Sequence, residues 1–293
     1  MSKRHVRHFP VSVILILLFL SIVSTFKASN FKKSIPDVVE MPKDVKESIK
    51  NTKPQKVLYV PILMYHYVEY VKDQGDTIRK SLNIMPYTFD LEIKTLKDAG
   101  FHFITTADLA EALDDKKTLP PKSIILTFDD GYRDFYTDVF PILKKYQAKA
   151  VSYVVPNFLD KPNNLTTRQL KEIAKSGLVE IGAHTMDHTY LAGLPLHRVE
   201  YEVDQSKKTL EKLLGIPVVS FAYPYGAFDN QAIGVVKKAG FKSAVTTLPG
   251  IYTLDINRFF LYRIRPGGRI GEMLLDLFKS ESLKTSSSPA QIK

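Results

Sequence analysis

Short apolar runs and longer amphipathic stretches alternate along this chain. Apolar runs typical of strands cover residues 57–68, 123–128, 150–155, 179–183, 218–223 and 243–247. Apolar residues at helical spacing predict helices over 88–99, 136–146, 166–176, 198–214 and 230–239. Strands that alternate with helices in this way predict an α/β fold with a parallel sheet that is covered on both faces.

Unusual polar residues follow several of the predicted strands. They are Tyr65-His66, Asp129-Asp130, His184 with His188, and Tyr223-Pro224-Tyr225-Gly226. In a (β/α) barrel the carboxyl ends of the strands meet at one rim, where such folds carry their chemistry. We therefore expect residues that are far apart in the sequence to share one pocket.

One carboxylate and two imidazoles form a ligand set that suits a divalent transition metal. The chain has no cysteine, so thiolate ligands and disulfides are excluded and a metal must be held by histidine and carboxylate. Zinc (Zn) is the metal expected first, and cobalt (Co), nickel (Ni) or iron (Fe) would also fit these ligands. The second carboxylate of the Asp129-Asp130 pair is then left as a base, which indicates a metal-dependent hydrolase.

Both ends of the chain differ in composition from its centre. Residues 1–30 combine a basic tip with an apolar run over 9–26, which predicts a signal peptide or a membrane anchor rather than a core helix. Residues 31–56 are rich in Lys, Asp, Glu and Pro and predict a flexible linker. The expected catalytic domain spans 57–280, and 281–293 is expected to be a disordered tail.

The composition is that of a globular protein with one large domain. Of 293 residues, 44% are apolar and 25% are charged, and the formal net charge is +10. No long Lys/Arg run favours nucleic acid, so the charge fits a cell wall or lipid headgroups. We expect a monomer that is secreted or held at the outer face of the membrane, with a membrane contact through residues 1–30 if they are not cleaved.

The motifs resemble those of the polysaccharide deacetylases with a NodB-type domain, which are similar to carbohydrate esterase family 4. Thr127-Phe128-Asp129-Asp130-Gly131 resembles the first motif, His184-Thr185-Met186-Asp187-His188 the second, and Phe221-Ala222-Tyr223-Pro224-Tyr225-Gly226 a variant of the third. The start Val60-Pro61-Ile62-Leu63-Met64-Tyr65-His66 resembles the branch of biofilm poly-N-acetylglucosamine deacetylases. The resemblance implies a distorted (β/α) barrel that removes N-acetyl groups from a polysaccharide.

The resemblance also implies roles for individual residues. Asp129 would be the general base, and Asp130, His184 and His188 would hold the metal. The backbone N–H of Tyr225 would bind the oxyanion, with Tyr223 and Pro224 in the same motif. The substrate would contain N-acetylglucosamine, in a biofilm polymer, peptidoglycan or a chitin-like chain.

This chain lacks two residues of the family pattern, the arginine that orients the base and the late histidine that acts as general acid. Ala222 stands where many relatives carry an arginine, so the group that orients Asp129 must come from elsewhere, and we consider Arg263 or Arg265, which could equally be surface arginines. Relatives use a late histidine as general acid, but the seven histidines of this chain end at His197. We hypothesise that His66 is the acid; the alternative is a structural histidine.

Two other functions stay open at this point. The chain could be an exported carbohydrate-binding protein that keeps the fold without turnover. A hydrolase of peptides or phosphoesters would be expected to show a His-Glu-x-x-His pattern or a two-metal ligand set, and neither is present. Tyr132, Tyr225 and Phe228 near the predicted rim could stack on sugar rings or pack in the core.

Overall fold

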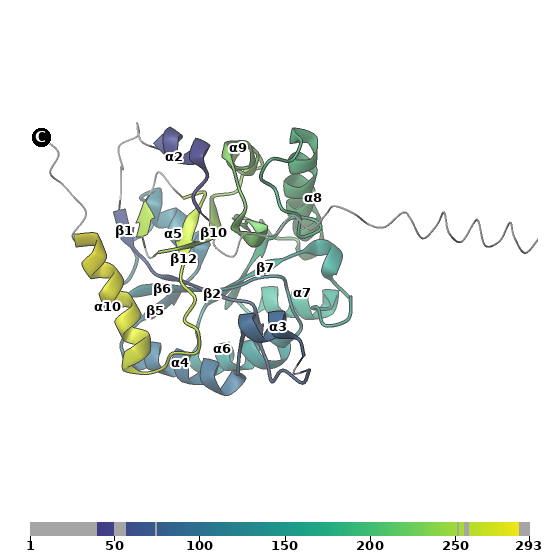
Figure 1. Ribbon diagram of the computed structural model, residues 1–293. Coiled ribbons are helices and arrows are strands. Elements are labelled where there is room, and N and C mark those ends of the chain that lie inside the picture. Colours follow the sequence, from purple (N-terminus) through teal and green to yellow (C-terminus); the bar gives the residue numbers. More distant parts are fainter. Residues whose placement is uncertain (1–39, 50–56, 74, 251, 255–257, 287–293) are drawn as a thin grey trace, which may run out of the picture. The chain divides into compact units, whose positions relative to one another are not determined.

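The computed structural model describes residues 40–49, 57–73, 75–250, 252–254 and 258–286, and Figure 1 draws it as a ribbon. The predicted signal or anchor segment, residues 1–30, lies outside the described residues. Within the described ranges, no helix has the length and apolar character needed to cross a membrane. The fold below belongs to the unit Val39–Lys293.

Parallel strands form a nearly closed barrel. Its strands are β2 (Ile62–Tyr65), β5 (His102–Ile104), β6 (Ser123–Phe128), β7 (Ala150–Val154), β8 (Val179–Ala183), β9 (Ser220–Ala222), β10 (Ser243–Pro249) and β12 (Leu261–Arg263). They follow the order β12-β10-β9-β8-β7-β6-β2, and β5 also pairs with β6. The end strands meet where Met64 N donates to Ile264 O and Ile264 N donates to Ile62 O, both at 2.8 Å.

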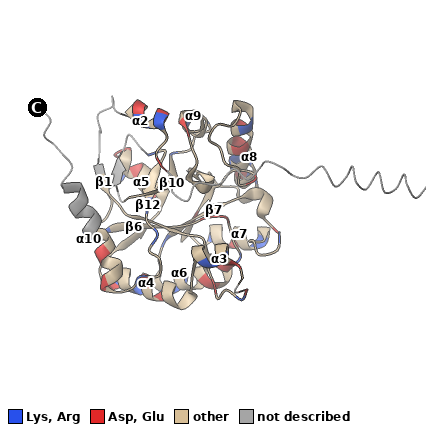
Figure 2. Cartoon of the chain, viewed as in Figure 1, with Lys and Arg blue, Asp and Glu red and all other residues tan. Residues whose placement is uncertain are grey.

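Helices connect the strands and lie around the barrel in Figure 1. They are α2 (Lys43–Ile49), α3 (Thr77–Leu82), α4 (Pro86–Asp98), α5 (Thr106–Leu113), α6 (Phe140–Tyr146), α7 (Thr167–Lys175), α8 (Leu196–Leu214), α9 (Asn230–Lys238) and α10 (Glu272–Ser286). Two small pairs complete the fold: β1 (Val57–Tyr59) with β11 (Tyr252–Leu254), and β3 (Tyr67–Val68) with β4 (Asn83–Ile84). Figure 2 shows charged residues along the helices, whereas β6 and β7 carry none.

The two faces of each strand pack in different clusters because successive side chains point to opposite sides. Along β6, Ile124 and Leu126 pack with residues of the helices. Their neighbour Ile125 instead packs with Ile62 and Val151 from the adjoining strands, as expected for the interior of a barrel. The apolar runs of the sequence are therefore strands buried on both faces.

The predicted α/β barrel is confirmed, and the predicted strands and helices fall within a few residues of the observed ones. Segment 57–68 is divided into β1, β2 and β3 rather than one strand. Two expectations about the ends need correction. Residues 43–49 of the expected linker form α2, because Val45 is buried and Asp44 accepts the N–H of Asn230 at the start of α9. Helix α10 also continues to Ser286, into the expected tail.

A carboxyl group is buried in the aromatic core behind the rim. Glu92 on α4 is fully buried and accepts a 2.8 Å hydrogen bond from the hydroxyl of Tyr65, while its Oε1 has no hydrogen-bond partner among the described residues. The Tyr65 ring stacks on Phe128 with ring centroids 5.0 Å apart. Burial raises the pKa of Glu92 to about 8, against the opposing effect of the Tyr65 hydroxyl.

This raised pKa predicts a pH-dependent stability. An unfolded glutamate titrates near 4.5 and Glu92 in the folded protein at about 8. The contribution of Glu92 to the free energy of unfolding is therefore complete below pH 4.5, falls as the pH rises from there, and is fully lost above about pH 8. Between these values the loss approaches about 1.4 kcal/mol per pH unit. Urea unfolding at pH 5, 7 and 9 should show this loss in the wild type and its absence in Glu92→Gln.

The matched control is Glu172→Gln. Glu172 also accepts a 2.8 Å hydrogen bond from a tyrosine, Tyr136, but on the surface. This substitution should leave the pH dependence of the wild type unchanged. A Glu92→Gln variant that loses stability with pH as steeply as the wild type would contradict the prediction.

Candidate active site

The two adjacent aspartates leave the end of β6 in a left-handed turn. Asp129 N continues the pairing with β2 by donating to Tyr65 O at 3.1 Å. Asp130 has φ 73° and Gly131 has φ 66°, a conformation that aspartate tolerates better than most residues. Both carboxylates are buried, with exposures of 3% for Asp129 and 5% for Asp130. The turn therefore holds two acids at the carboxyl end of a strand and away from bulk water.

The two histidines come from the loop that follows β8. His184 is buried and its N–H donates to Val154 O, so it is still held by the neighbouring strand. Thr185 and His188 have φ values of 60° and 57°. The Thr185 hydroxyl accepts the N–H of Thr189 at 2.9 Å, which ties the two ends of the loop together.

Asp130, His184 and His188 meet with the geometry of a metal centre. Asp130 Oδ1 lies 3.3 Å from His184 Nε2 and 3.1 Å from His188 Nε2, and one ligand atom from each residue lies within 4.8 Å of the others. Ligands at Zn distances of about 2.0–2.1 Å in a tetrahedron are about 3.3 Å apart. Asp130 Oδ1 is buried and has no hydrogen-bond partner in the described chain, so the residues present fit a cation.

The other ring nitrogens of the histidines are occupied. His184 Nδ1 lies 2.7 Å from the carbonyl oxygen of Ala222, which accepts only from a protonated nitrogen and so leaves Nε2 with its lone pair toward Asp130. His188 Nδ1 lies 3.2 Å from the hydroxyl of Tyr225. Partners of this kind fix ring orientation in metal sites.

Arg263 forms a bidentate ion pair with Asp129. Its Nη1 and Nη2 each donate to one carboxylate oxygen of Asp129 at 2.7 Å. Its Nε donates to Thr246 O at 2.9 Å and its Nη1 also donates to the Thr127 hydroxyl at 3.0 Å. With 1% exposure, Arg263 is one of the largest buried side chains. Of the two arginines considered from the sequence, Arg263 is therefore the one that contacts Asp129.

These neighbours control the charge of the acids and bases. Burial alone would raise the pKa of both aspartates. The Arg263 guanidinium outweighs burial at Asp129 and lowers its pKa, and the two imidazoles hold the pKa of Asp130 well below its usual value. Burial would lower the pKa of His184, but the nearby carboxylates of Asp130 and Asp129 outweigh it and raise that pKa.

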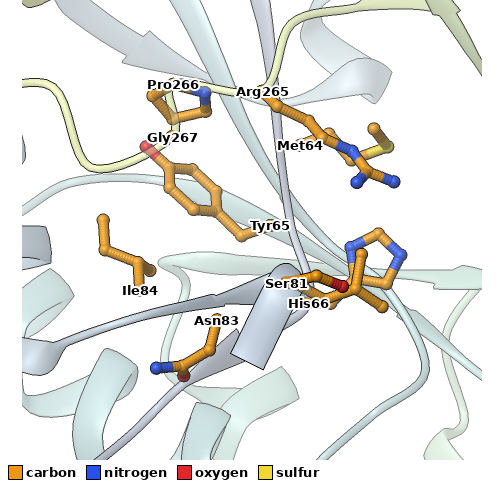
Figure 3. Close-up of a pocket in the computed structure, with 10 residues that line it drawn as sticks. Met64, Tyr65, His66, Ser81, Asn83, Ile84, Arg265, Pro266 and Gly267 are labelled. Carbon is orange, nitrogen blue, oxygen red and sulfur yellow. The ribbon is translucent and has the colours of Figure 1, made fainter. Parts of the chain in front are cut away.

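His66 and Arg265 lie on the wall of a cavity of about 60 Å³ beside these residues (Figure 3). His66 Nε2 is 3.9 Å from Asp129 Oδ2, and burial lowers the pKa of His66 despite the nearby aspartates. Arg265 is exposed, and within the described residues no hydrogen bond or ion pair joins it to a carboxylate. The structure thus brings His66 to Asp129 and leaves Arg265 at the margin.

The third motif forms the tight turn η3 (Pro224–Gly226) beside His188. Tyr225 has φ 59° and exposes 37% of its surface, whereas Tyr223 is fully buried. A Cβ on Gly226 would lie 2.1 Å from Thr247 Oγ1, so this position requires glycine. The turn places the ring of Tyr225 against that of His188, with ring centroids 4.6 Å apart.

Of the aromatic residues considered for sugar stacking, Phe228 packs in the core and does not lie at the rim. It has 1% exposure and stacks on Phe260, so it belongs to the core and cannot contact a sugar. Tyr132 is partly buried and stacks on Tyr67 with centroids 3.9 Å apart. Tyr190, which the sequence analysis missed, exposes 37% of its surface and lies 6.3 Å from the Tyr225 ring. Its position two residues after His188 could have indicated from the sequence that it lies near the site.

The comparisons with known proteins agree with this arrangement. A family model described as polysaccharide deacetylase matches residues 116–244. YxkH of Bacillus subtilis (strain 168), which is classed by name with the polysaccharide deacetylases, is 32% identical over 234 residues, or 80% of each chain. The poly-beta-1,6-N-acetyl-D-glucosamine N-deacetylase of Staphylococcus aureus (strain N315) is 28% identical over 200 residues, covering 63% of this chain and 68% of that protein.

A solved structure gives the same result in three dimensions. The Streptococcus pyogenes deacetylase PplD, in complex with acetate, superimposes with a TM-score of 0.69 and 30% sequence identity. The match covers 78% of this chain and 99% of PplD. From its sequence, its barrel and its relatives, this chain belongs to the polysaccharide deacetylase family of enzymes.

Proposed function

We propose that this polysaccharide deacetylase removes N-acetyl groups from a polymer of N-acetylglucosamine by metal-assisted hydrolysis. The observation that carries the proposal is the three-ligand cluster of Asp130, His184 and His188 beside a separate buried carboxylate, Asp129, which adjoins Asp130 in the sequence and is held by Arg263. Asp130 would bind the metal, and its neighbour Asp129 would be free to take a proton. Metal-assisted amide hydrolysis requires this division of roles.

Asp130, His184 and His188 would hold the metal, for which zinc is the first candidate and cobalt, nickel or iron also fit. When bound there, a divalent ion polarises the acetamide carbonyl and makes water more acidic. An amide is a poor electrophile, so both effects lower the barrier. The low pKa of Asp130 keeps this ligand ionised.

Asp129 would accept the proton of the attacking water. Each carboxylate oxygen takes one hydrogen bond from Arg263 and retains a second lone pair for the water. Arg263 is a positioning residue here, because it fixes the plane of the carboxylate and keeps it ionised. It would supply the function of the arginine that many relatives carry where this chain has Ala222.

The remaining roles concern the oxyanion and the leaving nitrogen. The N–H of Tyr225 would bind the negative oxygen of the tetrahedral intermediate, and Pro224 and Tyr223 shape the turn that carries it. His66, whose lowered pKa leaves it neutral at rest, would receive the proton that Asp129 takes from the water and pass it to the leaving amine, because its Nε2 lies 3.9 Å from Asp129 Oδ2.

A β-1,6-linked polymer is our first choice of substrate. The Staphylococcus aureus relative carries that substrate in its name, and the start Met64-Tyr65-His66 resembles the same branch. The neighbouring exposed rings of Tyr190 and Tyr225 offer apolar faces beside His188 for a sugar of the chain. Peptidoglycan and chitin-like chains are the alternative substrates.

The protein would meet such a polymer outside the cell. Export is proposed from the basic tip and apolar run of residues 1–30, which would act as a signal peptide or as an anchor. The deacetylase would act as a monomer, secreted or at the outer face of the membrane or in the cell wall. Free amines made by the reaction would render the polymer cationic and increase its adhesion to anionic surfaces.

The proposal predicts acetate release from β-1,6-linked N-acetylglucosamine oligomers. A chelator should abolish the release and added zinc should restore it, because Asp130, His184 and His188 alone do not activate the amide. Asp129→Asn should lower turnover by about 10²–10⁴-fold while zinc affinity is kept, since an amide cannot accept the proton.

The same experiment separates the alternatives. Oligomers with β-1,4 linkages test chitin-like substrates, and Asp98→Asn gives the same chemical change on the surface of α4 with no expected effect. Oligomer binding without acetate from any polymer would favour the carbohydrate-binding protein over the enzyme.

A second prediction concerns Arg263. Arg263→Lys keeps the charge but loses the bidentate contact, so it should reduce turnover by about 10²-fold through misplacement of Asp129, with little change in zinc affinity. Arg265→Lys is the matched control two residues further along, just after β12, and should retain turnover. Equal losses in both variants, measured as acetate release by folded protein, would contradict the role of Arg263.

A third prediction tests His66 as the acid. His66→Ala should lower acetate release from the sugar amide by about 10²-fold or more and leave zinc affinity nearly unchanged. Hydrolysis of 4-nitrophenyl acetate should be largely retained, because that leaving group departs without a proton. His102→Ala, at an exposed histidine on β5, is the control. Undiminished release from the amide would reject the role.

A further inference from the structure

Glu202 is a buried carboxylate that the proposed reaction does not use. It lies on α8 with 0% exposure. Its Oε2 accepts the backbone N–H groups of Met186 and Asp187, both at 3.0 Å, and its Oε1 accepts from Arg198 Nη2 at 3.2 Å. One fully buried side chain thus binds two consecutive amides of another segment.

That segment is the loop between the two histidines of the metal centre. Met186 and Asp187 are the central residues of the five that begin at His184 and end at His188. The loop has left-handed backbone at Thr185 and at His188, a conformation that residues other than glycine rarely adopt without a compensating contact. The sequence of the loop has no glycine that would adopt this shape freely.

We propose that Glu202 is a positioning residue for the metal centre, which it serves by holding this loop in the ligating shape. The inference rests on the proposed function in one respect, that Asp130, His184 and His188 bind a metal. Two N–H groups that converge on one oxygen form a concave anion site, and a charged acceptor makes these bonds stronger than a neutral one would. Helix α8 provides a rigid support for the acceptor.

The contact sets the spacing of the two imidazoles. His184 is held from the barrel side by Val154 O and Ala222 O, whereas the backbone of His188 depends on the shape of the loop. Among the hydrogen bonds of the described residues, the His188 ring contacts the Tyr225 hydroxyl of the η3 turn. Without Glu202 the loop would keep His184 in place and lose the position of His188. The expected defect is therefore weak metal binding by an otherwise folded protein.

The chain offers a matched control on the same helix. Glu211 also accepts a backbone N–H from another segment, that of Val218 at 3.0 Å, and pairs with Lys207 at 2.7 Å. It stands nine positions after Glu202 and contacts no residue of the histidine loop among its hydrogen-bond partners in the described chain. Glu211→Gln therefore removes one charge from α8 without touching the metal centre.

The experiment compares zinc affinity, measured by calorimetry or chelator competition, in the full-length wild type, Glu202→Gln and Glu211→Gln. Outer contacts of metal sites typically change affinity by about 10–100-fold, so E202Q should bind zinc at least about tenfold more weakly and E211Q should match the wild type. The visible spectrum of the cobalt-loaded protein should change in E202Q alone, because His188 moves relative to the ion.

Glu202→Asp is the second variant if E202Q does not fold. It keeps the charge on a shorter side chain and should bind zinc more weakly than the wild type and more tightly than E202A. Wild-type affinity and spectrum in E202D or E202Q would overturn the inference, as would an equal loss of affinity in E211Q. A wild-type protein that binds no metal would instead overturn the proposed function.

Discussion

The buried ion pair between Asp129 and Arg263 joins the proposed reaction centre to the closure of the barrel. A guanidinium and a carboxylate with 1% and 3% exposure are each too costly to bury alone, so each requires the other. Arg263 also donates to the hydroxyl of Thr127, which donates to Leu63 O on β2. The hydrogen bonds that orient the proposed base therefore cross β6, β2 and β12, where the sheet returns to its start.

The sequence predicted the barrel because its central strands are apolar on both faces and are separated by amphipathic helices. The short β5 and β12 were missed, since three residues give no periodicity. Helix α2 was assigned to a linker because Val45 alone is buried among charged neighbours. Such short elements are stabilised by contacts with distant residues, which composition cannot show.

The grouping of the site residues followed from one rule, that carboxyl ends of parallel strands meet. That rule could not decide between Arg263 and Arg265. In an extended strand residues two apart point to the same side, and the sequence does not show that β12 ends at Arg263. Glu202 could have been found, since it lies with Val199, Val203 and Ser206 on the buried stripe of a helix, where a lone carboxylate needs a partner. Arg198, four residues earlier, is a partner that the sequence could show, but the two backbone amides of Met186 and Asp187 could not be predicted from side-chain identities.

The separation of the ion pair along the chain has a consequence for assembly. Asp129 and Arg263 are 134 positions apart, and the arginine lies on the last strand of the barrel. A polypeptide that ends before β12 would contain both proposed metal-binding motifs but would lack the guanidinium that neutralises Asp129. A fragment with every recognisable motif would therefore still lack the residue that holds the proposed base in place.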